Sequence, residues 1–177
     1  MLKWILLGLG GVIVVFLILV ALQPSDFKVE RSATLRAPAP AAFAQVNDFQ
    51  NWQAWSPWEK VDPALKRRYD GPKAGTGAVY AWQGNKDVGE GRMTITESRP
   101  GELVRIKLEF IKPFAAVNDT VFRFQPSGDG TTVTWTMSGQ NNFVSKAMCL
   151  FVNMDRMVGG MFEQGLAQMK TVVERRP

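Results

Sequence analysis

The segment Leu103–Ile111 reads LVRIKLEFI, and its alternation decides the fold class. In an extended chain, Val104, Ile106, Leu108 and Phe110 share one face, while charged side chains occupy the other face. Such alternation predicts a strand in a sheet that has one dry face and one wet face. The neighbouring segments are therefore expected to supply further strands with the same dry face.

Turn-forming residues divide the chain from residue 65 to residue 140 into short runs. Gly71-Pro72, Pro100-Gly101 and Lys112-Pro113 are three of these separators, and no helical period lies between them. This spacing predicts an antiparallel meander. The predicted strands are Phe27–Leu35, Leu65–Asp70, Ala78–Gln83, Glu90–Glu97, Leu103–Ile111, Asn118–Gln125 and Thr132–Ser138.

The last part of the chain changes to helical period. Apolar residues recur at three- and four-residue steps from Val144 to about Glu174, which predicts a long helix with one apolar stripe. Gly159-Gly160 interrupts the stripe and is expected to bend the helix. Because this helix is long enough to cover the dry face, the predicted fold class is α+β, with helices on one face of a curved antiparallel sheet.

An aromatic connector, FQNWQAWSPW at residues 49–58, lies before the meander. One interpretation is a loop that folds under the sheet and plugs one end of the core. The other is an aromatic lip at the entrance to an apolar site. Trp55 is expected in the plug, whereas Trp52 and Trp58 fit either interpretation.

The run Trp4–Leu22 carries no charged side chain and has the length that crosses a bilayer, about 20 residues. We expect residues 1–24 to form an uncleaved transmembrane anchor and residues 25–177 to form one domain. A cleaved signal peptide is the alternative, but the exit VALQP at residues 20–24 offers no small-x-small cleavage site. Lys3 before the run favours a single-pass protein whose domain lies on the extracytoplasmic side.

The composition excludes several classes of chemistry. The chain has no histidine, which excludes Ser-His-Asp triads, Cys-His dyads and His-ligated zinc. Its one cysteine, Cys149, excludes an intrachain disulfide and a cysteine-rich metal site. The net charge of +5 includes no Lys/Arg-rich block, so nucleic-acid binding is not predicted. We expect no metal, no cofactor and a monomer.

Three stretches together resemble a known superfamily. They are APAPAAF at Ala37–Phe43, the aromatic connector at Asp48–Trp58, and MDRMVGGMFEQGLAQMK at Met154–Lys170. Their order around the meander is similar to that in SRPBCC proteins, which include START-type lipid-transfer domains, plant pathogenesis-related allergens and polyketide cyclases. The resemblance implies a helix-grip fold: a seven-stranded antiparallel sheet wrapped around a long C-terminal helix, with an apolar cavity between them. It carries over no catalytic residue, because the superfamily has no universal catalytic motif.

The implied cavity would be lined by the dry face of the sheet and the stripe of the helix. Taken singly, each apolar residue there is also explained by ordinary core packing. The candidate cavity residues are Tyr80, Ile106, Leu108, Phe110, Phe122, Trp135, Phe151, Asp155, Val158, Phe162 and Leu166, with Trp52 and Trp58 at a possible entrance.

Two charges interrupt the apolar pattern. Arg31 falls on the apolar phase of the first strand, and Asp155 falls in the helix stripe. A buried charge is costly unless it is paired, so Asp155 is expected to face inward and pair with Arg31, Tyr80 or Asn118. Alternatively, Asp155 begins a helix after a break near Asn153 and caps its backbone.

Three functions remain open. The first is a membrane-tethered binding or transport module for a lipid or another hydrophobic small molecule. The second is an enzyme of polyketide cyclase or dehydratase type, which requires a positioned acid or base such as Asp155, Tyr80 or Glu163. The third is a regulatory partner of another membrane protein, with a filled core and the Trp52–Trp58 surface as the contact.

Overall fold

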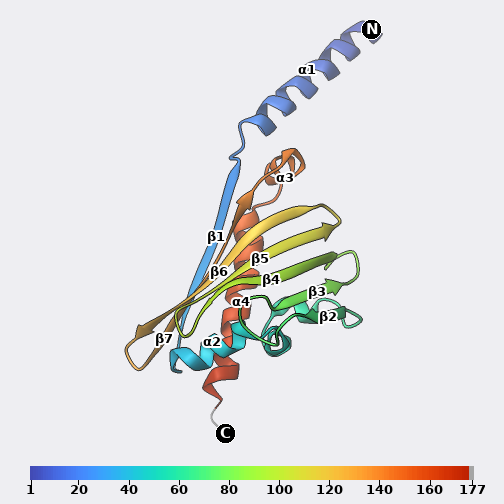
Figure 1. The fold of residues 1–177 in the computed structure, drawn as a ribbon. Helices are drawn as coiled ribbons and strands as arrows, with labels where there is room; N and C mark the ends of the chain where they lie inside the picture. The colour runs from blue at the N-terminus through green and yellow to red at the C-terminus, as the bar shows by residue number, and fades with distance from the viewer. Residues whose placement is uncertain (176–177) are drawn as a thin grey trace.

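The computed structural model describes the backbone of residues 1–175 and their side chains, apart from those of residues 2, 5 and 6. Seven strands and four α-helices form in this part of the chain, with two short 3-10 helices (Figure 1). In chain order they are α1 (Leu2–Ala21), β1 (Asp26–Leu35), α2 (Ala39–Asn47), η1 (Phe49–Ala54), η2 (Pro57–Lys60), β2 (Lys66–Asp70), β3 (Val79–Gln83), β4 (Glu90–Arg99), β5 (Leu103–Lys112), β6 (Ala116–Ser127), β7 (Gly130–Gln140), α3 (Phe143–Cys149) and α4 (Met154–Glu174).

The seven strands form one antiparallel sheet in the order β1-β7-β6-β5-β4-β3-β2. The predicted meander from β2 to β7 is confirmed, and so is the α+β fold class. β1 pairs with β7, so that Val29 lies opposite Met137 and Arg31 lies opposite Trp135. The first strand of the domain therefore closes the edge that the last strand would otherwise expose.

The two faces of the sheet differ as the alternation of Leu103–Ile111 predicts. On the inner face, Val104, Ile106 and Phe122 have no exposed surface. On the outer face, charged side chains form ion pairs across neighbouring strands, including Arg92–Glu109 at 2.8 Å. Burying the apolar face drives the sheet to curve around whatever covers that face, and the charged face stays in water.

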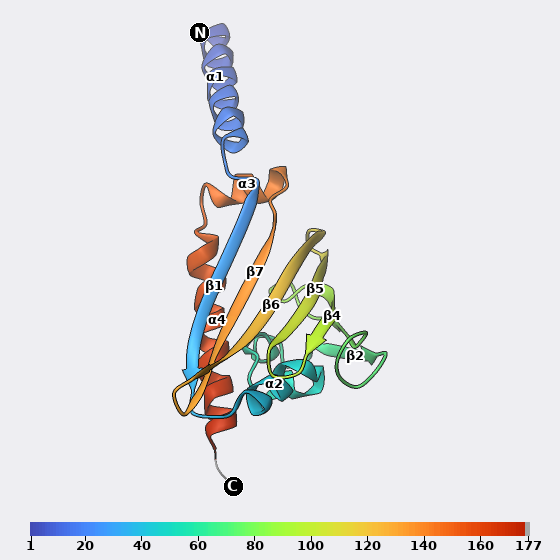
Figure 2. The same cartoon turned by 60° about the vertical axis from the view of Figure 1, so that its left-hand side comes forward.

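Helix α4 covers the inner face and runs along it from one end to the other (Figure 2). Its residues Phe162, Leu166 and Met169 are buried against the sheet. The connector η1–η2 fills one end of the core, where Trp52 and Trp55 are buried. The interpretation of the connector as a plug is confirmed for Trp55.

The prediction of a single C-terminal helix is wrong in one respect, because the segment forms two helices, α3 and α4. The chain leaves the helix at residues 150–153 and not at Gly159-Gly160. Asn142 and Asn153 explain the two starts, since their side chains accept hydrogen bonds from the backbone N–H groups of Ser145 and Arg156. Asparagine caps a helix by satisfying one of its first N–H groups in this way. Gly159 and Gly160 lie inside the continuous helix α4.

Helix α1 projects away from the sheet and meets the domain beside α3 (Figures 1 and 2). The hydrophobic core cluster contains only residues from Phe27 onward, so α1 contributes nothing to it. Among the residues whose side chains are described, no helix combines the length and the apolar character that crossing a membrane requires. The transmembrane span expected at Trp4–Leu22 is therefore not confirmed.

Two glycines of α4 provide a matched test of how closely the helix lies on the sheet. A Cβ atom at Gly165 would approach the Trp135 ring to 2.9 Å, whereas nothing lies within 4 Å of one at Gly160. We expect Gly165→Leu to lower the free energy of unfolding by about 1–3 kcal/mol, the usual cost of overpacking. Gly160→Leu should leave it unchanged or raise it by up to about 1 kcal/mol, through helix propensity. Urea denaturation followed by circular dichroism measures both, and equal effects would contradict this packing.

Candidate functional site

A cavity of about 220 Å³ lies between the inner face of the sheet, α4 and the connector η1–η2. Helix α4 packs mainly against β1, and the space lies farther along the inner face, where residues of β3 to β7 line it. Most of its walls are apolar or aromatic. The lining residues are Trp52, Ser56, Trp58, Glu59, Leu65, Tyr80, Trp82, Asp87, Val88, Met93, Leu108, Phe110, Thr120, Trp135, Met137, Val158 and Phe162.

The structure brings most of the candidate residues to this cavity. Ile106, Phe122 and Leu166 belong to the core but do not line the cavity. Trp52 lies deep in it and not at an entrance, because its ring is buried and its Nε1–H donates to the Val46 carbonyl at 3.1 Å. The candidates that line it are Tyr80, Leu108, Phe110, Trp135, Val158, Phe162, Trp52 and Trp58.

Phe151 does not line the cavity, which corrects its place among the candidates. Its side chain is 79% exposed, because residues 150–153 leave the helix between α3 and α4 and carry it away from the sheet. The helical period that grouped Phe151 with Val158 does not continue through this break.

Asp155 is also outside the cavity, although its expected pair with Arg31 forms. The Asp155 side chain is 59% exposed, and its two oxygens accept from Arg31 Nη1 and Nη2 at 3.0 and 2.9 Å. Glu163 accepts from Nε of the same guanidinium at 2.7 Å. The hydrogen bonds from Arg31 lower the pKa of Asp155. Arg31 therefore joins β1 to the first turns of α4 at the surface, and Asp155 is not a cavity group.

A polar cluster that the sequence did not reveal sits in the cavity wall. Glu59, at 6% side-chain exposure, accepts from the Tyr80 hydroxyl at 2.6 Å with one oxygen and from Arg67 Nε at 2.6 Å with the other. The rings of Tyr69 and Tyr80 stack with centroids 5.3 Å apart. Glu59 follows the aromatic connector, and no local pattern links it to β2 and β3, so only the folded chain reveals the cluster.

Burial raises the pKa of Tyr80, and its hydrogen bond to Glu59 raises it further. The phenol therefore stays neutral at physiological pH, and its O–H donates a hydrogen bond to the Glu59 carboxylate. Arg67 supplies the opposite charge that makes burial of the Glu59 carboxylate tolerable. The cluster gives one wall of an otherwise apolar cavity a fixed polar surface.

The cavity opens to solvent beside the turn between β3 and β4. Asp87 in that turn is exposed, whereas Thr120 and Trp135 at the other end of the lining are buried. Within the described residues, no group of three or more His, Cys, Asp and Glu side chains is placed to hold a metal ion.

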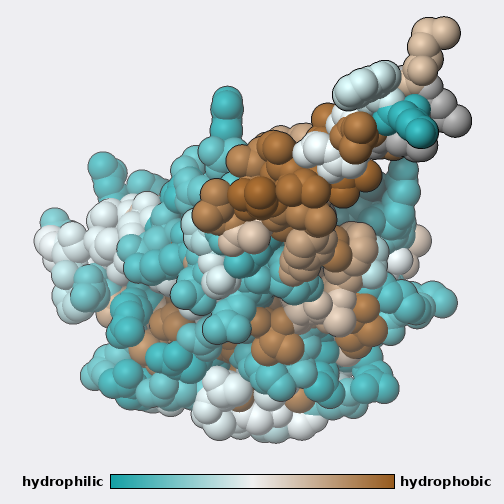
Figure 3. All heavy atoms as spheres, turned by 90° about the horizontal axis from the view of Figure 1, so that it is seen from above, coloured by the Kyte–Doolittle hydropathy of each residue, from teal (hydrophilic) through white to brown (hydrophobic). Residues whose placement is uncertain are grey.

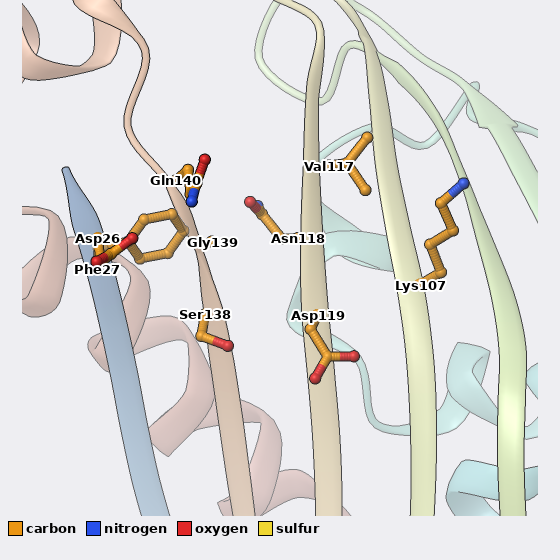
Figure 4. A pocket seen from close by; sticks show the side chains of 9 residues that line it. All are labelled: Asp26, Phe27, Lys107, Val117, Asn118, Asp119, Ser138, Gly139 and Gln140. Carbon is orange, nitrogen blue, oxygen red and sulfur yellow. The ribbon is translucent and has the colours of Figure 1, made fainter.

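A second hollow, of about 600 Å³, lies where β1 begins and β7 ends (Figure 4). Lys107, Val117 and Gln140 line it and are exposed, so it is open to solvent along the sheet. Asn118 is buried there, and its amide contacts Met137 Sδ at 3.9 Å. Phe27 is the only aromatic residue in the lining of this hollow, whereas aromatic side chains form much of the first cavity, which remains the candidate site.

A long C-terminal helix held by a seven-stranded antiparallel sheet, with a mostly apolar cavity between them, defines a helix-grip protein. The chain belongs to the polyketide cyclase/dehydrase and lipid transport family, which it matches over residues 26–174. This is an SRPBCC-type family, as the three sequence stretches implied. Among curated proteins, none matches the sequence.

Several solved structures share the fold. Protein CV1439 from Chromobacterium violaceum matches with a TM-score of 0.61 and 16% identity, over 86% of this chain and 99% of its own. The Aha1 dimer from Colwellia psychrerythraea matches with a TM-score of 0.59 and 11% identity, over 84% and 97%. The di-domain ARO/CYC protein BexL from the BE-7585A biosynthetic pathway matches with a TM-score of 0.63 and 15% identity, over 90% of this chain and 53% of its own.

Replacing Tyr80 tests the polar cluster. In Tyr80→Phe a buried oxygen of Glu59 loses its donor, which we expect to lower the free energy of unfolding by about 1–3 kcal/mol. Tyr69→Phe is the control, because its hydroxyl is only half-buried and accepts one bond from Gln53. Urea denaturation at neutral pH measures both, and a loss in Tyr80→Phe no greater than in the control would contradict the cluster.

The same variant has a pH signature. The raised pKa means that folded Tyr80 holds its proton more tightly than the unfolded chain does. The stabilisation that the protonated Tyr80 hydroxyl adds to the free energy of unfolding is therefore complete below the pKa of an unfolded tyrosine, about 10. It is lost as the pH rises above that value. Above pH ~10 the stability of the wild type should fall more steeply than that of Tyr80→Phe.

Proposed function

We propose that this protein binds a hydrophobic small molecule in the cavity between α4 and the sheet. The single observation that carries the proposal is a cavity, lined mostly by aromatic and aliphatic side chains, that extends into the hydrophobic core. A close-packed core of this size would normally contain few voids larger than a water molecule. The cavity counts against a purely structural partner with a filled core.

The volume of the cavity restricts what enters. About 220 Å³ is below the range of roughly 300–1,000 Å³ that is usual for ligand pockets. A compact ring system or a single short chain fits the space better than a phospholipid with two acyl chains. We infer that a lipid ligand enters with only one chain unless the turn between β3 and β4 moves outward.

We also propose that α1 attaches the domain to a membrane. Its side chains include many large apolar groups in contact with solvent, such as Leu7, Val12 and Ile18, and contiguous apolar surface of this kind marks membrane or protein contacts. Phe143 and Met148 of α3, which packs beside α1, are also exposed. Seen from this end, hydrophobic side chains gather along α1 (Figure 3). We further propose that the domain lies on the extracytoplasmic side, as Lys3 before the helix favours, and that the protein is a monomer.

A polyketide cyclase or dehydratase activity is the second candidate. The observation that favours it is Glu59, a carboxylate that lines the cavity beside the neutral hydroxyl of Tyr80. A carboxylate in a cavity can act as a general base, and the fold is shared with two di-domain ARO/CYC proteins. A binding protein releases its ligand unchanged, whereas a cyclase or dehydratase releases a product of different structure. Mass spectrometry of the molecule recovered after incubation therefore distinguishes the two functions.

Filling the cavity tests ligand binding. Val158 is half-buried and lines the cavity, whereas its neighbour Met157 is exposed on α4. We expect Val158→Trp to lower ligand occupancy by about tenfold or more, a loss of at least ~1.4 kcal/mol in binding. Met157→Trp, the control, should leave occupancy unchanged. Organic extraction of the purified full-length variants, followed by mass spectrometry, measures the hydrophobic molecules that each retains.

Two results would argue against the binding proposal. One is a folded Val158→Trp protein that retains the same molecules in the same amounts as Met157→Trp. The other is a wild-type protein that yields no bound molecule by native mass spectrometry, even after incubation with membrane lipids. Thermal unfolding of each variant shows whether the substituted chain is folded.

Removal of residues 1–24 tests the attachment. We expect the full chain to float with phosphatidylcholine–phosphatidylglycerol vesicles in a density gradient, and the chain from Ser25 to stay at the bottom. The shortened chain should keep its unfolding transition, because the core cluster begins at Phe27. A full chain that stays at the bottom as a soluble oligomer would instead assign α1 to contacts between copies.

A further inference from the structure

Outside α1, the exposed apolar side chains gather at one end of the domain. At this end β1 begins, β7 ends and β5 turns back into β6, since Asp26 is paired with Gln140 and Asn118 with Gly139. Two segments there carry large apolar side chains that are between 43% and 79% exposed. They are Ile111, Phe114 and Val117 of the β5–β6 hairpin, and Phe143, Met148 and Phe151 of α3 and the residues that follow it.

Among the described residues, the opposite end of the domain carries no exposed side chain of this kind. The other large apolar side chains that are exposed after residue 22 are Val144, Val152, Met157 and Val61. The first two belong to the same segments, and Met157 lies in the first turns of α4. Val61 precedes Asp62, whose carboxylate accepts a hydrogen bond from the Asn85 N–H in the β3–β4 turn. Single exposed apolar residues are ordinary, but a gathering of them marks a contact surface.

Helix α1 leaves the domain at this same end, and its exit is held in place (Figures 1 and 2). Residues 22–25 separate α1 from β1, and four extended residues span at most about 14 Å. Asn141 donates hydrogen bonds to the carbonyls of Pro24 and Ser25 at 3.2 and 2.7 Å, and Lys146 Nζ donates to Ser25 Oγ at 2.9 Å. A membrane that holds α1 therefore lies against this end of the domain.

The mouth of the cavity is at the same end. Asp87 and Val88 of the β3–β4 turn line the cavity, and so does Phe110 at the base of the β5–β6 hairpin. The turn packs on the hairpin, because a Cβ atom at Gly89 would collide with the hairpin backbone and approach Pro113 Cδ to 3.4 Å. The tip of the hairpin therefore stands beside the opening.

We propose that this end of the domain rests on the bilayer, with the tip of the β5–β6 hairpin among the lipids and the cavity mouth at the membrane surface. The partner is a lipid surface, because the apolar helix α1 leaves from this end and exposed apolar side chains of the domain lie beside it. A few partly buried side chains contribute less than a whole apolar helix, so the hairpin orients the domain and α1 retains it.

A hydrophobic ligand in this arrangement passes between the bilayer and the cavity without crossing water. The β3–β4 turn and the β5–β6 hairpin then form the two sides of the passage. This inference rests on the proposed attachment of α1 and on the proposed ligand site, and it adds the direction from which the ligand enters.

Quenching by spin-labelled lipid tests the contact. Cys149→Ala removes the one cysteine, and Phe114→Cys then carries a nitrobenzoxadiazole label on the hairpin tip. The control label is at Asp129→Cys, because Asp129 is an exposed residue of the β6–β7 turn at the opposite end. The full chain is placed in phosphatidylcholine nanodiscs with and without 5-doxyl phosphatidylcholine. We expect the doxyl lipid to quench the Phe114→Cys label at least twofold more than the Asp129→Cys label.

The possible failures are distinguishable. Equal, weak quenching of the two labels, in a chain that floats with vesicles, would overturn the inference and leave the attachment through α1 intact. A Phe114→Cys label that neither doxyl lipid nor added iodide quenches would also overturn it, and would assign the hairpin to a contact with protein. A full chain that does not float contradicts the attachment itself.

A second label reports on the mouth of the cavity. Lys86→Cys places it on the β3–β4 turn, at an exposed residue beside Asp87. In this chain Phe114→Asp should lower the doxyl quenching at least twofold, because a charged side chain is expelled from the apolar part of the bilayer. Phe114→Leu is the matched control and should preserve the quenching. Phe114 is exposed, so circular dichroism should show the same unfolding transition in both variants. Equal quenching in the two variants would contradict the role of the hairpin.

Discussion

The stacking of Phe162 on Trp135 joins the two layers of the molecule. One ring comes from α4 and the other from β7, and their centroids are 4.1 Å apart. Two large planar surfaces that remove each other from water contribute both apolar burial and a favourable ring contact. Gly165 lets the helix come close at the same place, since a Cβ atom there would meet Trp135 and Pro57. The position of α4 on the sheet follows from this contact, and the cavity is the space that remains beside it.

The aromatic connector contributes a second constraint. Trp52 and Trp55 fill one end of the core and bond through their indole N–H groups to carbonyls at the end of α2. The chain then continues through η2, which brings Glu59 to Tyr80 and Arg67. A buried carboxylate is tolerated there because both of its oxygens accept short hydrogen bonds. The connector therefore closes the core and also gives the cavity its charged wall.

The family and the fold leave the function open between a binding protein and an enzyme. Helix-grip proteins as different as Aha1 and the ARO/CYC proteins share this architecture with the chain, at identities of 11–15%. The function has to be argued from the site, because one fold hosts many activities. In this chain the walls are mostly apolar, the polar groups are few and fixed, and the volume is small, which favours selective binding of a compact molecule.

Local patterns in the sequence determined the sheet, its two faces and the C-terminal helix. The strands and turns follow from residues that are neighbours along the chain, such as the alternation in Leu103–Ile111. The sequence alone therefore predicts these elements. The resemblance of Asp48–Trp58 and Met154–Lys170 to SRPBCC proteins identified the family. The sequence offered a break near Asn153 as one alternative, but helical period also carried Phe151 into the stripe of the helix. The folded chain has the break, with Asn153 as the cap of α4, and Phe151 lies outside the cavity.

Contacts between distant segments were decided by the tertiary structure. Glu59, Arg67 and Tyr80 come from η2, β2 and β3, and no spacing in the sequence brings them together. Whether a buried indole has a partner likewise depends on which carbonyls the folded chain places beside it. Trp135 and Trp55 are both buried tryptophans, and only the fold gives Trp55 Nε1 an acceptor and leaves Trp135 Nε1 without one. The sequence thus determined the sheet and the helix that form the cavity. Packing between distant segments determined which polar groups lie in the cavity wall.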